Sequence, residues 1–360
     1  MVLTIPRLGN THIAMRALCD ALGIGFVVPE NNRTIMTRGA AVAPEDMCLP
    51  FKIMMGNFMD GIERGADTVL ITGSCGPCRF GEYGELFGRL LKKAGYPADV
   101  IVIDSPSEIS LKALLSRFGQ IGKASGASKA AKLAALRQTY QILKKADAMD
   151  AAVYRTAGFE TCPGACGREL DACRCDMLAG HGTHTALHAL KEHRRNLRSI
   201  ALDPAKTPLR VAIAGEVYSM FEPYANLHIE QRLMRMGVST QRLLTPSWWL
   251  RDLAMKPLHL NSPAVKRESA PFLPVSVGGH ARETIAHAVS ARKAGMDGVI
   301  QIFPMGCMPE IVAKAALHAT GLPLLTLVVD EMTGDAGYDT RIEAFLDMLE
   351  ARRRQAALWA

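Results

Sequence analysis

Short apolar runs alternate with amphipathic stretches along the first part of the chain. Residues 11–22 place apolar side chains at helical spacing, so this stretch is predicted to be a helix. Further helices are predicted over residues 51–64 and 83–94, and buried strands over residues 25–29, 68–72 and 100–103. This alternation of strands and helices predicts a parallel sheet with helices on both faces.

The middle of the chain has a different pattern, and the α/β pattern then returns. Residues 111–149 are rich in Ala, Lys, Leu and Gln without a strand signal, so they are predicted to be helical. A Cys-, Gly- and Arg-rich loop is predicted over residues 161–176, followed by a His-rich helix over residues 182–197. Beyond residue 209, strands are predicted over 211–214, 299–302 and 324–329, and helices over 228–236, 310–318 and 339–349.

An internal similarity links the two α/β parts. Residues 65–71 and 295–300 both pass from a Gly-x-Asp turn into a buried strand, and a cysteine follows each strand. Two related halves predict a pseudo-symmetric pair of α/β domains, which we expect to face each other across an interdomain cleft. Open parallel sheets bind ligands beyond the carboxyl ends of their strands, so this cleft is the expected site. The expected organisation is a first α/β domain (1–115), a mainly helical connecting segment with the Cys/His-rich loop (116–205), a second α/β domain (206–350) and a basic C-terminal tail (351–360).

Composition and charge narrow the function classes. The chain of 360 residues has a net charge of +7, which is weak evidence for an acidic partner or an anionic ligand. No basic stripe interleaved with aromatic residues is visible, so we expect no nucleic-acid partner. The start of the chain lacks a secretory signal, and the longest apolar runs are too short to span a bilayer, so we expect a cytoplasmic protein without a membrane partner. Nine cysteines in that compartment favour metal binding or redox chemistry over disulfides.

The strongest chemical signal is Cys75-x-x-Cys78, directly after a predicted strand. Two thiolates three residues apart can bind one metal centre, and four thiolates complete a [4Fe–4S] site. Cys48 lies just before a predicted helix, whose positive end favours an anionic sulfur, and Cys307 comes from the second domain. These four cysteines are the candidate ligands. A zinc site, a redox dithiol and inert thiols are the alternatives.

A second constellation follows the long helical stretch. Four cysteines fall within fourteen residues, and three histidines come next; they are Cys162, Cys166, Cys173, Cys175, His181, His184 and His188. They could hold a structural zinc or a second cluster, and the alternative is a surface loop with reduced cysteines followed by a solvated helix.

The remaining sequence features are weaker candidates for a binding or catalytic role. Cys19 falls inside an amphipathic helix and is interpreted as a small core residue. Residues 6–11 and 215–218 occupy equivalent strand-to-helix loops, which we interpret as turns. The chain has no Walker A loop and no Gly-x-Gly-x-x-Gly fingerprint, so it is not expected to bind nucleotide itself.

Several motifs together resemble one superfamily. They are Pro44-x-Asp46-x-Cys48-x-Pro50-x-Lys52, Cys75-Gly76-Pro77-Cys78-Arg79-Phe80-Gly81, Phe303-Pro304-x-Gly306-Cys307-x-Pro309-Glu310 and Thr340-Arg341-Ile342-Glu343-Ala344-Phe345. The superfamily comprises the 2-hydroxyacyl-CoA dehydratase subunits and the double-cubane cluster proteins, and the chain most resembles its acyl-CoA dehydratase activase-related (CoA protein activase) branch. The resemblance covers both α/β parts.

The resemblance implies two flavodoxin-like domains with a cysteine-ligated iron–sulfur cluster between them. It carries the ligand role to Cys48, Cys75, Cys78 and Cys307. It also implies a homo- or hetero-oligomer and a separate ATP-hydrolysing activase, which has its own cluster and delivers low-potential electrons. Dehydratases of the family form a ketyl radical on a hydroxyacyl-CoA, whereas double-cubane proteins reduce small molecules. The cysteines at 162–175 depart from the family pattern, which leaves the number and nuclearity of clusters open. An electron carrier, a cluster-assembly scaffold and a zinc-stabilised binding protein are the other functional hypotheses.

Overall fold

The computed structural model of the chain describes residues 1–73, 79–103, 111–258 and 260–358. It contains two four-stranded sheets, and all strand pairs in both sheets are parallel. The chain divides into two compact units. Unit 1 consists of Met1–Met149, Asp171–Arg195 and Pro246–Asn261, and unit 2 of Asp150–Leu170, Asn196–Thr245 and Ser262–Ala360.

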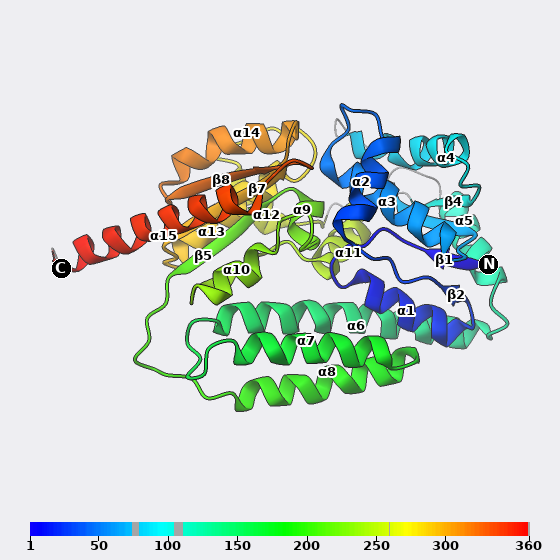
Figure 1. Ribbon diagram of the computed structural model, residues 1–360, viewed down its shortest axis with the longest axis horizontal. Helices are drawn as coiled ribbons and strands as arrows, with labels where there is room; N and C mark the ends of the chain where they lie inside the picture. Colours follow the sequence, from blue (N-terminus) through cyan, green and yellow to red (C-terminus); the bar gives the residue numbers. More distant parts are fainter. Residues whose placement is uncertain (74–78, 104–110, 259, 359–360) are drawn as a thin grey trace. The chain divides into compact units, whose positions relative to one another are not determined.

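Unit 1 is built on a sheet with the strand order β2-β1-β3-β4. The strands are β1 (Val2–Thr4), β2 (Gly25–Phe26), β3 (Thr68–Thr72) and β4 (Asp99–Ile103). Its first helices are α1 (Thr11–Leu22), α2 (Arg33–Val42), α3 (Leu49–Glu63), α4 (Tyr83–Lys93) and α5 (Leu111–Lys123). Helix α1 lies on one side of the sheet, whereas α3 and α4 lie on the other (Figure 1). Because helices cover both faces of the sheet, β3 is an almost continuous apolar run.

Helices α2 and α3 cross at two glycines. A Cβ atom at Gly39 would overlap the backbone oxygen of Lys52, and a Cβ atom at Gly56 would overlap that of Ile35. Neither glycine needs unusual backbone angles, so the missing side chain is what allows the two helices to approach each other. The crossing fixes the N-terminal half of α3, which follows Cys48.

Three long helices occupy the middle of the chain: α6 (Lys129–Thr156), α7 (Ala165–Ala179) and α8 (Gly182–Ser199). The expected helical stretches over 111–149 and 182–197 are therefore present. The expected loop over residues 161–176 is mostly absent, because α7 begins at Ala165. Helix α6 begins in unit 1 and ends in unit 2, so the helical segment expected between two domains is shared between the two units.

Unit 2 repeats the topology of unit 1. Its strand order is β6-β5-β7-β8, formed by β5 (Arg210–Gly215), β6 (Ser239–Gln241), β7 (Gly298–Pro304) and β8 (Leu324–Val329). When the strands of each unit are numbered along the chain, their order across the sheet is second, first, third, fourth in both units, which is the flavodoxin-like arrangement. The α/β fold class with two flavodoxin-like parallel sheets is therefore confirmed, and the internal similarity of the sequence extends to strand order.

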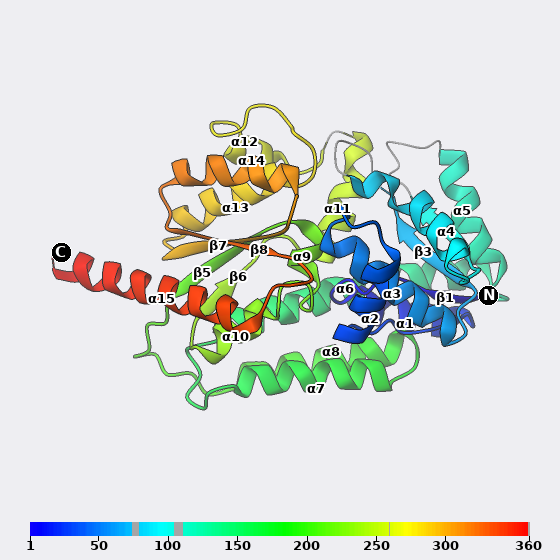
Figure 2. The same ribbon diagram turned by 45° about the horizontal axis from the view of Figure 1, so that its top comes forward.

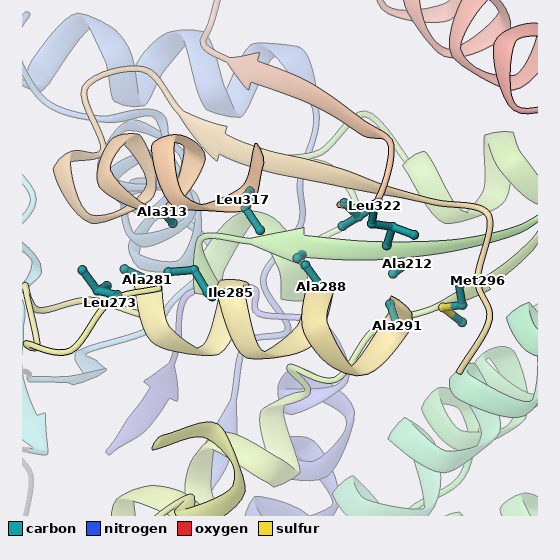
Figure 3. Close-up of a cluster of buried hydrophobic side chains, with 12 residues drawn as sticks. Ala212, Leu273, Ala281, Ile285, Ala288, Ala291, Met296, Ala313, Leu317 and Leu322 are labelled. Atoms are coloured by element: carbon teal, nitrogen blue, oxygen red, sulfur yellow. The ribbon is translucent and has the colours of Figure 1, made fainter. Parts of the chain in front are cut away.

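Helices cover both faces of the second sheet (Figure 2). The remaining helices are α9 (Val217–Phe221), α10 (Ile229–Arg235), α11 (Pro246–Met255), α12 (Pro263–Ser269), α13 (Ala281–Lys293), α14 (Met308–Leu317) and α15 (Asp335–Leu358), of which α11 belongs to unit 1. One face packs against α13 and α14, where small alanines of α13 let the helix lie close to Ala212 of β5 and Leu317 of α14 (Figure 3). Residues 351–358 continue α15 instead of forming a separate tail. Among the described helices, none combines the length and the apolar character needed to cross a bilayer.

Candidate metal centre

In each unit, one pair of neighbouring strands marks the place where a flavodoxin-like sheet binds its ligand. The crossover connections leave the first and third strands in opposite directions, so a crevice opens between their carboxyl ends. In unit 1 these strands are β1 and β3, and Cys75 and Cys78 follow β3; both lie outside the described residues. In unit 2 the strands are β5 and β7, and Cys307 follows β7.

Cys48 is the N-cap residue of α3 in unit 1. Its backbone is extended (φ −68°, ψ 156°), its carbonyl accepts from Phe51 N at 3.0 Å, and Pro50 stands in the first turn. Its side chain makes no capping hydrogen bond to α3. The thiol is half-buried, and its Sγ atom contacts the hydroxyl of Tyr83. The sulfur therefore lies beside the positive end of a fifteen-residue helix and next to a hydroxyl that can donate to a thiolate.

An aromatic cluster surrounds this contact. The ring of Phe51 stacks on Phe87 with centroids 4.3 Å apart and meets Tyr83 edge-on at 4.8 Å. Phe58 and Phe80 extend the cluster through edge-on and tilted contacts. Tyr83 is 2% exposed, so its ring is held by packing and its hydroxyl has little freedom to leave the sulfur.

A buried cation lies one helical turn after Cys48. Lys52 is 5% exposed, and its Nζ atom donates to the carbonyl of Glu45 at 3.3 Å. Lys52 thus adds a positive charge to the first turn of α3. The helix start and the hydroxyl of Tyr83 suit a negatively charged sulfur at Cys48, whether it is a free thiolate or a metal ligand.

Cys307 repeats this local arrangement in unit 2. It is the N-cap residue of α14, with an extended backbone, no side-chain capping bond and a proline, Pro309, in the first turn. Its carbonyl accepts from Ile311 N at 3.0 Å. The pattern Cys-x-Pro at a helix start thus occurs in both units, and both thiols are half-buried.

A buried polar network supports the start of α14. Glu310 is fully buried, and its carboxyl group accepts from Thr284 Oγ1 and Gln301 Nε2, both at 2.9 Å. Gln301 Nε2 also donates to the backbone carbonyl of Glu310 at 2.9 Å, and Thr326 Oγ1 donates to Gln301 Oε1 at 3.4 Å. Burial raises the pKa of Glu310 to about 8, against the opposing effect of the two hydrogen bonds. The network ties α14 to β7, β8 and α13.

The four cysteines of the second constellation lie on or just before α7. Cys166 and Cys173 are buried, whereas Cys162 and Cys175 are exposed. Burial raises the pKa of the Cys166 thiol, and the Glu160 carboxylate beside it adds to the shift. Within the described residues, no three His, Cys, Asp or Glu side chains are grouped so that they could hold a metal ion. The structure therefore does not bring these sulfurs together, and a shared metal site there stays an untested expectation.

The histidines that follow lie just before α8 and in its first half. His184 and His188 are exposed on α8, and the ring of His184 lies 3.4 Å from Gln138 Nε2. His181 is close to Asp20 at 3.5 Å. Cys19 is buried in the core of unit 1, and burial raises the pKa of its thiol to about 12, as suits the core role expected for it.

Residues 6–11 contain a turn before α1, as expected, whereas in residues 215–218 only Glu216 separates β5 from α9. Both connections contain polar groups that sequence reasoning did not identify. In the first, Asn10 Nδ2 donates to Asp147 at 3.2 Å, and His12 Nδ1 lies 2.7 Å from the carbonyl of Gly9. Burial lowers the pKa of His12 to about 3, with the nearby Arg7 guanidinium adding to the effect. In the second, Glu216 accepts from the backbone of its own helix. These contacts organise the loops and supply no ligand set.

Sequence reasoning also missed Tyr83, which no motif singled out, because its contact with Cys48 joins residues 35 positions apart. Comparisons of the chain with protein-family models and with curated proteins found no match.

Proposed function

We propose that this protein is an iron–sulfur protein whose cluster is ligated by Cys48, Cys75, Cys78 and Cys307. The observation that supports the proposal best is the repeated Cys-x-Pro helix start. In each unit a half-buried thiol stands at the N-cap of a helix without capping it, at the carboxyl edge of a flavodoxin-like sheet. Such a position offers partial positive charge and N–H donors to an anionic sulfur.

The residues around Cys48 fit a cluster ligand. A bound cluster would supply one-electron redox chemistry at low potential. Lys52 and the start of α3 would offset negative charge at the sulfur, and the hydroxyl of Tyr83 would donate a hydrogen bond to it. The aromatic cluster would exclude water from one side of the ligand.

The reaction class follows from the family resemblance of the motifs. We propose that the protein accepts electrons from an ATP-hydrolysing activase in the cytoplasm and reduces or dehydrates a small substrate. An electron carrier or a cluster-assembly scaffold would share the cluster but lack turnover. A zinc-stabilised protein would lack both iron and sulfide.

The test is anaerobic purification followed by iron, sulfide and zinc analysis and by paramagnetic resonance of the reduced protein. We expect iron and sulfide in near-equal amounts, with both strongly reduced in the Cys48→Ser and Cys307→Ser variants. Cys19→Ala is the matched control, because it removes a core thiol and should keep the full cluster content. Zinc in place of iron would overturn the proposal. Unchanged iron and an unchanged spectrum in Cys307→Ser would remove Cys307 from the ligand set.

A further inference from the structure

One stretch of unit 1 carries all of the excess positive charge of the chain. Between Leu111 and Lys145 there are eight Lys and Arg residues and no Asp or Glu. They are Lys112, Arg117, Lys123, Lys129, Lys132, Arg137, Lys144 and Lys145. Because the whole chain has a net charge of +7, the remaining residues together have 7 − 8 = −1. The charge that looks diffuse along the sequence is therefore concentrated on α5 and on α6 up to Lys145.

The same stretch exposes large apolar side chains. On α6, Leu133 is 71% exposed, Leu136 48% and Tyr140 37%, and on α5 Phe118 is 45% exposed. The three residues of α6 fall within about 60° of the helix circumference and span about 10 Å along its axis. They form one stripe along the helix.

Basic side chains lie within and beside this stripe. Lys129, Arg137 and Lys144 are exposed and share the same side of α6, within an arc of about 100°. None of the three takes part in an ion pair within the part of the chain that the structure describes. We call these six residues of α6 the basic apolar face.

The opposite side of α6 is anchored in the protein. Ala135, Ile142 and Ala146 are buried, and Ala135 packs in a core cluster with Leu18 and Leu22 of α1. Gln138, on a flank of the helix, accepts a hydrogen bond from Thr183 of α8 at 2.5 Å. The helix therefore cannot rotate to bury the basic apolar face, which is a fixed feature of the surface of unit 1.

We propose that the basic apolar face binds the surface of a membrane that contains anionic lipids. Lysine and arginine are attracted to lipid phosphates, while leucine and tyrosine side chains enter the headgroup region. A charge of one sign over 35 residues matches the uniform opposite charge of a lipid surface that contains anionic headgroups. The exposed leucines disfavour nucleic acid, because a phosphate backbone offers them no apolar contact. The proposal goes beyond the redox function and departs from the expectation that the protein has no membrane partner.

The test is sedimentation of the full chain with vesicles of phosphatidylcholine containing about 30% phosphatidylglycerol. We expect binding to these vesicles, little binding to pure phosphatidylcholine, and loss of binding as NaCl rises from about 0.1 M to about 1 M. Replacing Lys129, Arg137 and Lys144 by Gln should weaken binding about a hundredfold. Replacing Leu133, Leu136 and Tyr140 by Ser should weaken it about tenfold.

A matched control removes the same amount of charge elsewhere. Lys191, Arg194 and Arg198 are exposed on α8, and their replacement by Gln should change vesicle binding less than threefold. Circular dichroism of each variant checks that the fold is intact. The proposal is overturned if the parent protein does not sediment with the anionic vesicles, or if the α8 variant loses as much binding as the α6 charge variant. It is also overturned if the Ser variant binds as well as the parent, because the face would then be a general site for polyanions such as nucleic acid or acidic proteins.

Discussion

Glu310 allows a direct test of the buried network in unit 2, independent of any cofactor. It is fully buried at the start of α14, between Thr284 and Gln301. A buried carboxyl group without a cationic partner binds its proton more tightly than in water, and burial raises the pKa of Glu310 from 4.5 to about 8. The unfolded chain releases this proton near pH 4.5, whereas the folded protein keeps it up to about pH 8.

The sign of the effect on stability follows from proton binding. Between pH 4.5 and about 8 the folded state holds one proton more than the unfolded state at this site, so its contribution to the free energy of unfolding falls as pH rises. The free energy of unfolding falls by at most about 1.4 kcal/mol per pH unit because of this group, so its total loss across the interval is at most about 5 kcal/mol. Neighbouring carboxylates at Glu216 and Glu283 add to the rise in the pKa, although less than burial does.

The perturbation is Glu310→Gln. A glutamine carbonyl can accept from Gln301 Nε2, and its amide can donate to Thr284 Oγ1, so the size and the hydrogen bonds of the side chain are largely kept. Because glutamine does not titrate, the variant lacks the pH-dependent loss of stability. We therefore expect the stability of the variant relative to the parent protein to rise by several kcal/mol between about pH 5 and about pH 8.

The assay is urea unfolding of both proteins at a series of pH values, followed by circular dichroism. Subtracting the parent curve from the variant curve removes the titration of all other groups. Glu343→Gln, which removes an exposed carboxylate of unit 2, is the control and should give a flat difference. A constant offset between variant and parent would show only altered packing. If the difference for Glu310→Gln does not rise with pH, the carboxyl group is not held neutral by burial.

Three further predictions concern other parts of the molecule. Tyr83→Phe removes the hydroxyl beside Cys48. In the proposed cluster protein this should lower the reduction potential by about 40 mV in a redox titration, because about 1 kcal/mol of hydrogen bonding to sulfur is lost in the reduced state. An unchanged potential would show that this hydroxyl does not interact with the cluster. Gly56→Ala should destabilise unit 1 by about 1–3 kcal/mol in urea unfolding, because its Cβ overlaps the backbone of α2, whereas Gly119→Ala on α5 meets open space and should not. Burial lowers the pKa of His287 to about 4, so the unfolded chain binds a proton before the folded protein does as pH falls below 6.5. His287→Gln should therefore reduce the loss of stability between pH 6.5 and pH 4 by up to about 3 kcal/mol. Parallel curves of unfolding free energy against pH for variant and parent would contradict this.

Much of the fold could be predicted because the strands are buried on both faces. Every residue of β7 is buried, so the strand appears in the sequence as an apolar run with Gln301 as its one polar residue. Strand β3, with three of its five residues buried, was predicted for the same reason. Strand β4 was predicted within one residue although only Ile101 is buried, because its alternating Val and Ile residues favour a strand. Helix α2 was not predicted, because its packing depends on the glycine at position 39, which lowers helix propensity when considered without its neighbour α3.

The segment around Cys166 was predicted to be a loop, although it forms part of helix α7. Cys166, Leu170, Cys173 and Met177 are all buried, and their spacing of four, three and four residues is that of one helix face. The helical signal was therefore present in the sequence. It was missed because the cysteines were considered only as ligands, whereas buried cysteines such as Cys166 and Cys173 can also pack as small apolar residues.

The contacts around the proposed ligands could be predicted only in part. The motifs named Lys52 and Glu310 but did not indicate that both are buried, because burial depends on helices and strands distant in sequence. Tyr83 had no signal, since its contact with Cys48 depends on how α4 packs against α3. Cysteine spacing thus identifies candidate ligands, and tertiary packing determines the charge and the hydrogen bonds around them.

The two N-cap cysteines share a local backbone pattern but have different charged neighbours. Cys48 is followed one turn later by a buried cation, Lys52, whereas Cys307 is followed three residues later by a buried acid, Glu310. An ionised carboxylate there would oppose an anionic sulfur at the same helix end. Burial removes this conflict, because a pKa of about 8 keeps Glu310 neutral at pH 7. The first turn of α3 therefore carries an added positive charge, and the first turn of α14 carries no negative charge from Glu310, so neither opposes an anionic sulfur. The Glu310→Gln titration tests the second of these statements.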